Sequence, residues 1–176
     1  TRLNVDGWIN MALILASALY ANAIDVLDPK VYATTKKIFF WKRKKIFRTS
    51  NSFCDVSVYT PLPLQQKKDW IVFLGRFDEV KQVEQILLAL PYVYQQLQQI
   101  GNKDYHFYIL GHGTLETKLK QVLSNNEFQY LPITIRFQKD PWVIVNKSKV
   151  FLSLQLHNNY PSRSLLEAMA AGNIPV

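Results

Sequence analysis

Cysteine, glycine and proline are all scarce in this 176-residue sequence, which has one cysteine, six glycines and eight prolines. The single cysteine, Cys54, excludes an intramolecular disulfide and suits a reducing compartment. No activating partner for its thiol can be named, so we interpret Cys54 as a small apolar residue. No cluster of His, Cys, Asp and Glu predicts a metal site. The hydrophobic fraction of 48% is that of a globular protein, and we find neither internal repeats nor disordered segments.

A hydrophobic run long enough to cross a membrane is also missing. A span needs about 20 predominantly apolar residues, and the most apolar stretch, residues 8–27, is interrupted by Asn10, Ser17, Asn22 and Asp25. Its apolar positions recur at helical spacing, which predicts a buried amphipathic helix over residues 8–23. These positions are Ile9, Leu13, Ala16, Leu19 and Tyr20. No signal peptide is recognisable, and because the sequence starts at Thr1 we expect its natural beginning to lie upstream.

Positive charge, in contrast, is plentiful and unevenly distributed. The formal net charge is +8, and residues 1–60 hold nine basic and four acidic residues. The excess peaks in residues 36–47 (KKIFFWKRKKIF), where cations alternate with aromatic residues. Such a segment fits either a solvated basic face or a peripheral contact with anionic lipid headgroups. We expect no nucleic-acid partner, because no RNA- or DNA-binding motif accompanies it.

Strands and helices alternate from Trp70 onward. Four apolar runs and the start of a fifth are typical of buried strands: residues 70–74, 105–110, 133–137, 150–154 and 174 onward. Helical patterns lie between them, at residues 80–99, 114–123 and 162–171. We expect Pro91 to kink or break the first helix, Thr114 to cap the second, and Gly172 to end the third. The alternation predicts an α/β fold with a doubly wound parallel sheet, whose ligands bind beyond the carboxyl ends of the strands.

Residues 1–62 have a different organisation. The helix over residues 8–23 is followed by the apolar segment 24–28, a helix from Pro29 and a strand candidate at 45–49. Residues 60–63 (TPLP) and the polar stretch after them predict a stiff linker. We therefore divide the chain into residues 1–62, a fragment of a first α/β domain with its linker, and residues 63–176, a second domain.

The loop after the first predicted strand of the second domain brings two cations to the ligand-binding edge. Gly75 allows a sharp turn, and Arg76 and Lys81 follow it. A guanidinium gives forked contacts to a phosphate, and an ammonium adds a compact charge. The alternative interpretation is that Arg76 and Lys81 are surface cations that form ion pairs with Asp78 and Glu79.

Two further loops contain candidate binding residues. Gly111, in the LGHG loop, permits close approach of the backbone. Ser162, Arg163 and Ser164 open the last helix, whose free N–H groups and dipole favour an anion. Glu167 lies one turn further, where its carboxylate can accept both hydroxyls of a ribose. The structural alternative makes Ser162 a simple N-cap and Glu167 a first-turn acid that complements the dipole.

Together these segments resemble a known family. The sequences FLGRFDEVKQVEQILLAL, FYILGHGTLETKLKQVL and VFLSLQLHNNYPSRSLLEAMAAGNIPV are similar to the C-terminal, Rossmann-like domain of GT-B retaining glycosyltransferases of group 1 (family 4). The similarity covers residues 70–176, and SLLEAMAAGNIPV is its most specific part. Residues 21–40 and 45–61 resemble, more loosely, the end of the family's N-terminal, acceptor-side domain. The resemblance implies that the sequence is a fragment of a longer enzyme, cut at both ends and inactive by itself.

The resemblance also assigns roles to individual residues. Arg76 and Lys81 would stabilise the leaving diphosphate, which is the catalytic contribution of this domain. The implied donor-binding residues are Gly75, Gly111, Asn159, Pro161, Ser162, Arg163, Ser164 and Glu167. The family usually carries two glutamates with seven residues between them, and the first position here is Asn159. An amide can bind a sugar hydroxyl but supplies no negative charge, so this departure affects donor choice and activity.

The function implied is a metal-independent hexosyltransferase without a cofactor. It would move a hexose from a UDP- or GDP-sugar to a glycan or lipid-linked acceptor with retention, in polysaccharide biosynthesis. The expected location is the cytoplasm, with peripheral contact at the inner membrane surface through residues 36–47. The alternative is a degenerate, non-catalytic domain that binds a partner or a membrane, which Asn159 favours. A nucleotide-sugar epimerase fits less well, because the cleft lacks the acids and histidines that such a site needs.

Overall fold

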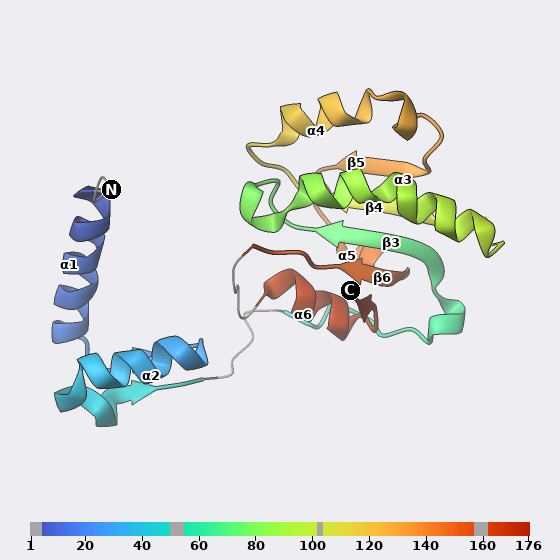
Figure 1. Cartoon of the computed structure of the whole chain (residues 1–176). Coiled ribbons are helices and arrows are strands. Elements are labelled where there is room, and N and C mark those ends of the chain that lie inside the picture. Colours follow the sequence, from blue (N-terminus) through green and yellow to red (C-terminus); the bar gives the residue numbers. More distant parts are fainter. Residues whose placement is uncertain (1–4, 50–54, 102–103, 157–161) are drawn as a thin grey trace. The chain divides into compact units, whose positions relative to one another are not determined.

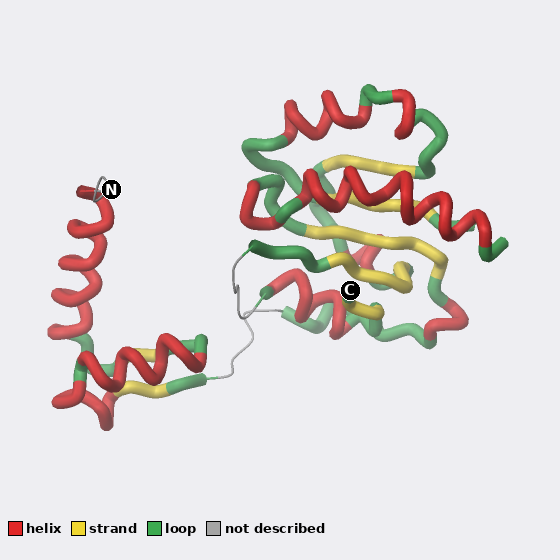
Figure 2. The backbone as a smooth tube through the Cα atoms, viewed as in Figure 1, coloured by secondary structure: helices red, strands yellow, loops and turns green. Residues whose placement is uncertain are grey.

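The computed structural model describes residues 5–49, 55–101, 104–156 and 162–176. The chain forms two compact units, Thr1–Asn51 and Ser52–Val176 (Figure 2). The linker segment that the sequence grouped with the first unit packs on the second one instead. Tyr59 is buried there, the Asn146 amide donates to the carbonyl of Val58 (3.1 Å), and the N–H of Thr60 donates to the Asn146 side chain (3.2 Å).

The first unit is a small α/β assembly whose helices and strands follow the sequence pattern. Its elements are α1 (Val5–Tyr20), β1 (Ile24–Asp25), α2 (Pro29–Ile38), the 3-10 helix η1 (Phe40–Lys45) and β2 (Ile46–Phe47). β1 and β2 pair in parallel, and Asp28 caps α2 by accepting hydrogen bonds from the N–H groups of Lys30 (2.8 Å) and Val31 (2.9 Å). Phe39 and Ile46 form its buried core with Ala18.

The expectation that α1 buries an apolar face is wrong for this structure. Leu13, Leu19 and Tyr20 are exposed, and α1 meets the rest of its unit through its last turn. There the Lys42 ammonium donates to the carbonyls of Ala18 (2.9 Å) and Leu19. Helical spacing shows which side chains share a face, but a neighbouring layer decides whether that face is covered.

The second unit is built on five parallel strands in the order β5-β4-β3-β6-β7 (Figure 1). The strands are β3 (Lys68–Leu74), β4 (His106–Leu110), β5 (Ile133–Arg136), β6 (Ser148–Leu152) and β7 (Ile174–Pro175). The chain first adds β4 and β5 on one side of β3 and then returns to add β6 and β7 on the other. The doubly wound parallel sheet predicted from the sequence is confirmed, and its topological switch point lies between β3 and β6.

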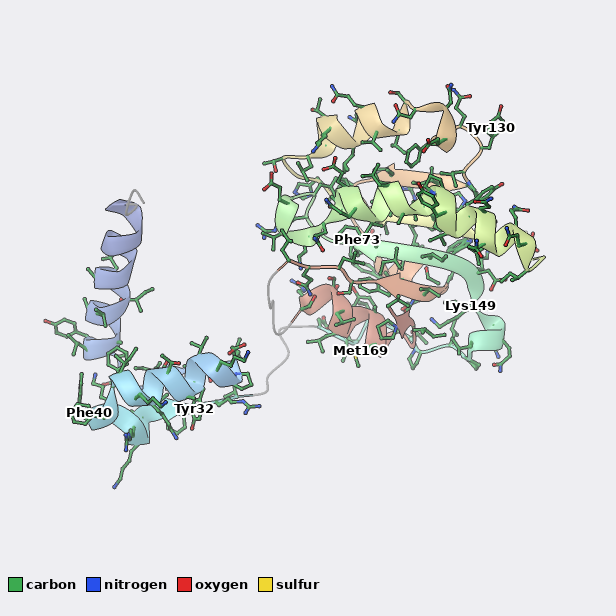
Figure 3. All side chains as sticks on the ribbon, in the orientation of Figure 1. Tyr32, Phe40, Phe73, Tyr130, Lys149 and Met169 are labelled. Atoms are coloured by element: carbon green, nitrogen blue, oxygen red, sulfur yellow. The ribbon has the colours of Figure 1, made fainter. Side chains whose placement is uncertain are left out.

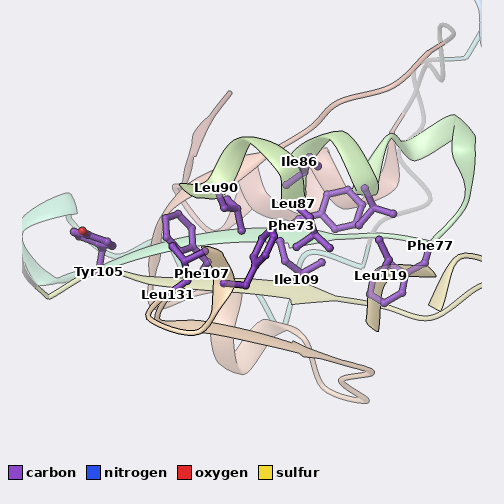
Figure 4. Packing of buried hydrophobic residues seen from close by; sticks show 12 residues of the cluster. Phe73, Phe77, Ile86, Leu87, Leu90, Tyr105, Phe107, Ile109, Leu119 and Leu131 are labelled. Atoms are coloured by element: carbon purple, nitrogen blue, oxygen red, sulfur yellow. The ribbon is translucent and has the colours of Figure 1, made fainter. Parts of the chain in front are cut away.

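Helices cover both faces of this sheet. They are α3 (Val83–Gln99), α4 (Glu116–Leu123), α5 (Trp142–Val145) and α6 (Arg163–Ala170), with short 3-10 helices at Leu64–Gln66, Glu79–Lys81 and Asn126–Phe128. On one face α3 and α4 pack on Phe73, Phe107 and Ile109, as Figure 4 shows. On the other face α5 and α6 pack on Val72 and Phe151. The near-continuous apolar strands of the sequence are explained by this burial on both sides.

Of the three local predictions about helix ends and interruptions, two need correction and one is confirmed. α3 continues through Pro91 instead of breaking there, and the interruption comes earlier, at Gln82, which adopts the left-handed conformation (φ 49°). The 3-10 turn Glu79–Lys81 therefore precedes the helix. Thr114 does not cap α4, because its hydroxyl faces the carbonyl of Phe77 (3.5 Å) and Leu115 occupies the N-cap position. Gly172 ends α6 as expected, with a positive φ of 77°.

Within the described residues, no helix combines the length and the apolar character needed to cross a membrane.

Candidate functional site

A cavity of about 830 Å³ lies in the second unit, beside the carboxyl end of β3 and the start of α6, the helix that follows β6. Its walls come from the segment before β3, the β3–α3 loop, the segment around α5 and the first turns of α6. The lining residues are Asp55, Val58, Tyr59, Leu74, Gly75, Arg76, Lys81, Lys139, Pro141, Trp142, Ser162, Arg163, Ser164 and Glu167. The cavity thus lies at the switch point, where an open α/β sheet binds its ligands.

The β3–α3 loop is held in place by backbone contacts with the β4–α4 loop. The N–H of Gly75 donates to the carbonyl of Leu110 (3.0 Å), and the N–H of Phe77 donates to that of His112 (2.9 Å). A Cβ added to Gly111 would lie 1.9 Å from the carbonyl oxygen of Gly75. Gly111 is therefore required for the close approach of two loops, and it is not among the residues that line the cavity.

Arg76 and Lys81 both face this cavity, as the sequence predicted. A guanidinium nitrogen of Arg76 lies 3.2 Å from a carboxylate oxygen of Asp78, and the side chain is 76% exposed. The Lys81 ammonium donates to the side-chain oxygen of Gln155 (3.2 Å), which follows β6. Asp78 also accepts a hydrogen bond from the N–H of Lys81 (3.0 Å), so the same acid orders the turn and pairs with the arginine.

Lys81 lies in a more enclosed position than Arg76. Burial lowers the pKa of its ammonium, Asp78 opposes this shift, and Arg76 adds to it. On the β6 side, the described hydrogen-bond partner of this partly buried cation is a neutral amide. An anion that binds beside Lys81 would stabilise its charged form. Lys81 is consequently the strongest anion-binding candidate of the loop.

The start of α6 forms the opposite wall. Ser162 is the N-cap residue and is buried, but its hydroxyl makes no capping hydrogen bond, so the first N–H groups of the helix have no side-chain cap. Glu167 is only 6% exposed, and its carboxylate accepts a hydrogen bond from Nε of Arg163 (2.8 Å). The sequence predicted Glu167 as an acceptor of ligand hydroxyls, and the structure adds that one of its oxygens is already engaged.

The charge of the lining is mainly positive. The cations are Arg76, Lys81, Lys139 and Arg163, and the acids are Asp55 and Glu167. Because Glu167 is paired with Arg163, the remaining field favours an anionic ligand. Among the described residues, no group of three or more His, Cys, Asp or Glu side chains could hold a metal ion.

Several lining residues were missed from the sequence. Lys139 and Trp142 come from the segment between β5 and β6, and Asp55 and Tyr59 come from the segment before β3. The sequence predicted that a strand ends at residue 137. It did not predict the short helix α5 that follows this strand. The proline-containing linker gave no sign that it packs against the second unit.

Three residues named from the sequence lie outside the described residues. They are Cys54, Asn159 and Pro161, so their roles stay predictions. His112 is described, its ring packs edge-on against Phe137 with 5.2 Å between ring centres, and it is not among the lining residues.

Solved structures with a similar fold support the assignment of the architecture. They include a variant of TarM from S. aureus in complex with fondaparinux, α-GlcNAc-glycerol and UDP, with 16% identity and a TM-score of 0.72. The match covers 94% of this chain and 31% of the TarM chain. The pneumococcal O-GlcNAc transferase GtfA, in complex with UDP and GlcNAc, is 17% identical (TM-score 0.66, 90% of this chain and 30% of that chain). Anabaena HepE, in complex with UDP and glucose, is 11% identical (TM-score 0.66, 94% and 46%).

At these identities the structures establish the fold alone, which is that of GT-B glycosyltransferases. The chain spans less than half the length of each of these proteins. Comparison with functionally curated proteins gives no match. The family model for glycosyl transferases group 1 matches residues 60–176. This range includes every lining residue of the cavity from Leu74 to Glu167. This chain therefore belongs to the group 1 glycosyltransferases.

Proposed function

We propose that the protein transfers a hexose from a UDP- or GDP-sugar to a glycan or lipid-linked acceptor, with retention of the anomeric configuration. The proposal treats it as a family 4 enzyme that needs no metal and acts in the cytoplasm, in polysaccharide biosynthesis. The observation that carries it is the placement of Arg76, Lys81 and the start of α6 around one cavity at the switch point. Family membership and the UDP named with three of the similar structures support the same donor class.

The donor diphosphate is proposed to lie between the β3–α3 loop and the first turn of α6. Arg76 and Lys81 contact it from one side, and the N–H groups of residues 162–164 contact it from the other. In the transfer step the bond between the sugar and the diphosphate breaks, and negative charge develops on the leaving oxygens. Cations already in place stabilise that charge without reorganisation, which lowers the barrier. Donor binding through positive groups of the protein would not require a metal ion.

The nucleoside is proposed to occupy the rest of the cavity. Glu167 accepts ribose hydroxyls with the carboxylate oxygen that Arg163 leaves open. Tyr59, Pro141 and Trp142 supply flat, apolar wall suited to a nucleobase. Asn159, where the family usually has a glutamate, is proposed to face the donor sugar as a neutral hydrogen-bonding partner.

A second candidate is a non-catalytic domain that keeps the fold and has lost turnover. Asn159 is the observation that favours it, because an amide at this position supplies no negative charge to the donor sugar. This candidate predicts nucleotide binding without transfer or hydrolysis of any nucleotide sugar.

The binding test uses calorimetric titration of UDP, GDP and pyrophosphate. The double variant Arg76→Ala/Lys81→Ala should bind UDP roughly 100-fold more weakly, because two charge-assisted contacts are lost. Glu167→Gln should weaken UDP about tenfold and leave pyrophosphate unchanged, since only the nucleotide carries a ribose. A matched control, Lys120→Ala/Lys147→Ala, removes two exposed cations that do not line the cavity. Equal affinity for UDP in the cavity variant and the control would refute the site.

Turnover is tested separately, with the longest form of the polypeptide that its gene encodes. That polypeptide is incubated with a panel of nucleotide sugars, and released nucleotide is measured with and without glycan or lipid acceptors. Release from any donor excludes the non-catalytic candidate. Tight nucleotide binding without release from the whole panel would overturn the proposed transferase in its favour.

A further inference from the structure

The first unit presents a surface on which cations and apolar side chains alternate. We call it the basic-aromatic surface, and it runs from the last turn of α2 through η1 to the residue after β2. Its exposed apolar members are Ile38, Phe40, Trp41 and Phe47. Its cations are Lys36, Lys37, Arg43, Lys44, Lys45 and Arg48. Figure 3 shows Phe40 at the turn from α2 into η1.

The fold of the unit forces these apolar side chains outward. Phe39 and Ile46 fill the small core, so their neighbours in η1 and β2 must face the other way. The Lys42 ammonium is tied to the last turn of α1, and Nε of Arg43 donates to the carbonyl of Lys36 (3.3 Å), which fixes η1 against α2. Phe40 and Trp41, which are 63% and 55% exposed, pack edge-on with 5.1 Å between ring centres. The surface is thus held in a defined conformation while its large rings remain in contact with solvent.

The charge of this surface is not balanced by neighbouring acids in the sequence. Residues 29–49 contain eight basic and no acidic residues. The two acids just before them have structural roles: Asp28 caps α2, and Asp25 accepts hydrogen bonds from the N–H (3.1 Å) and the hydroxyl (2.7 Å) of Thr49. The ion pairs identified between described residues all lie in the second unit. The basic-aromatic surface therefore keeps a strong positive potential.

We propose that the basic-aromatic surface docks on a bilayer that contains anionic phospholipids. Lysine and arginine side chains are attracted by the negative surface potential of such a bilayer. The rings of Phe40 and Trp41 make binding more favourable when they enter the headgroup region. A basic face without exposed rings would lack this contribution. Nucleic acid would match the cations equally well, but it gives exposed aliphatic side chains such as Ile38 no apolar environment. The proposal does not depend on sugar transfer, because the surface lies in the first unit and the donor cavity in the second.

The test is co-sedimentation of the 176-residue chain with vesicles of phosphatidylcholine, with and without phosphatidylglycerol. Binding should require phosphatidylglycerol and should fall as salt is added, since the attraction is screened. Lys44→Gln/Lys45→Gln removes two exposed cations with no structural contact described, and should lower the partition coefficient roughly thirtyfold. The control with the same change in net charge, Lys120→Gln/Lys147→Gln in the second unit, should bind as the parent chain does.

A second pair of variants tests the aromatic contribution. Phe40→Ser/Trp41→Ser should also lose binding, whereas Tyr92→Ser/Tyr130→Ser, which removes two exposed rings of the second unit, should not. Trp41→Phe should keep binding and lose the vesicle-induced blue shift of tryptophan fluorescence. Circular dichroism of each variant confirms folding. Equal binding to both vesicle types, equal loss in the control variants, or binding to duplex DNA with none to vesicles would overturn the proposal.

Discussion

Replacement of Gly111 by alanine tests whether the cavity at the switch point depends on the close approach of two loops. An added Cβ would lie 1.9 Å from the carbonyl oxygen of Gly75, and real Cβ contacts essentially never fall below 3.0 Å. The β3–α3 loop must therefore move away from residue 111 by about 1.1 Å or more. Such a shift disrupts the hydrogen bond from the N–H of Gly75 to the carbonyl of Leu110, now 3.0 Å long. It also displaces Arg76 from its place in the cavity wall.

The expected cost is about 3–6 kcal/mol of unfolding free energy. Overpacking contributes about 1–3 kcal/mol, the unfavourable φ of +154° about 1–2 kcal/mol, and the lost hydrogen bond about 1 kcal/mol. Gly101→Ala is the matched control, because Gly101 also has a positive φ (+80°) but nothing lies within 4 Å of its added Cβ. That control should lose only about 1–2 kcal/mol.

Urea denaturation measures both variants, and calorimetry measures their affinity for UDP. Gly111→Ala should lose stability and UDP binding together, whereas Gly101→Ala should keep its affinity. If Gly111→Ala were no less stable than Gly101→Ala, the close approach of the two loops would be refuted as the reason for this glycine.

Three further predictions concern backbone strain, a buried amide and pH. Gln82→Gly should stabilise the chain by up to about 1 kcal/mol, because it removes a left-handed non-glycine residue, and Gln82→Val should destabilise it by a similar amount; urea midpoints measure both. Asn173 is buried and its amide donates to the carbonyls of Val145 (3.1 Å) and Ser148 (2.8 Å), so Asn173→Asp should cost about 3 kcal/mol or more in thermal unfolding. Burial lowers the pKa values of Lys67 and Lys81, so between those values and 10.5 the unfolded chain holds more protons and stability should rise with pH. Denaturation at a series of pH values below 10 should show this rise in the parent chain and a flatter profile in Lys67→Met/Lys81→Met.

Much of the second unit could be predicted because its strands are buried on both faces. Residues such as Val72 and Phe107 belong to uninterrupted apolar runs, and only a strand with helices on both sides needs such a run. The rules of parallel connections restrict the strand order without selecting one, so the order and the position of the switch point came from the structure. The interruption at Gln82 was not predictable, since nothing in a glutamine indicates the left-handed conformation.

Two walls of the cavity at the switch point, the β3–α3 loop and the start of α6, were predictable from the sequence, and the other walls were not. Gly75, Arg76 and Lys81 are neighbours in the sequence, so the end of a single strand is enough to bring them together. Trp142 and Tyr59 reach the same cavity from distant segments, and neither carries a local pattern that marks it as a wall residue. The family resemblance likewise marked Glu167 as a ligand but did not indicate its ion pair with Arg163.

The sequence by itself determined the alternation of strands and helices, the strand-end cations, the serine-rich start of α6 and the basic-aromatic composition of residues 36–47. These properties depend on residue types at short spacing, which local backbone geometry turns directly into structure. The tertiary structure decided the contacts between segments far apart in the chain: the fit of Gly111 against Gly75, the bond between Lys81 and Gln155, and the exposure of Phe40 and Trp41. Such contacts depend on which surfaces meet after folding, and no local pattern specifies that.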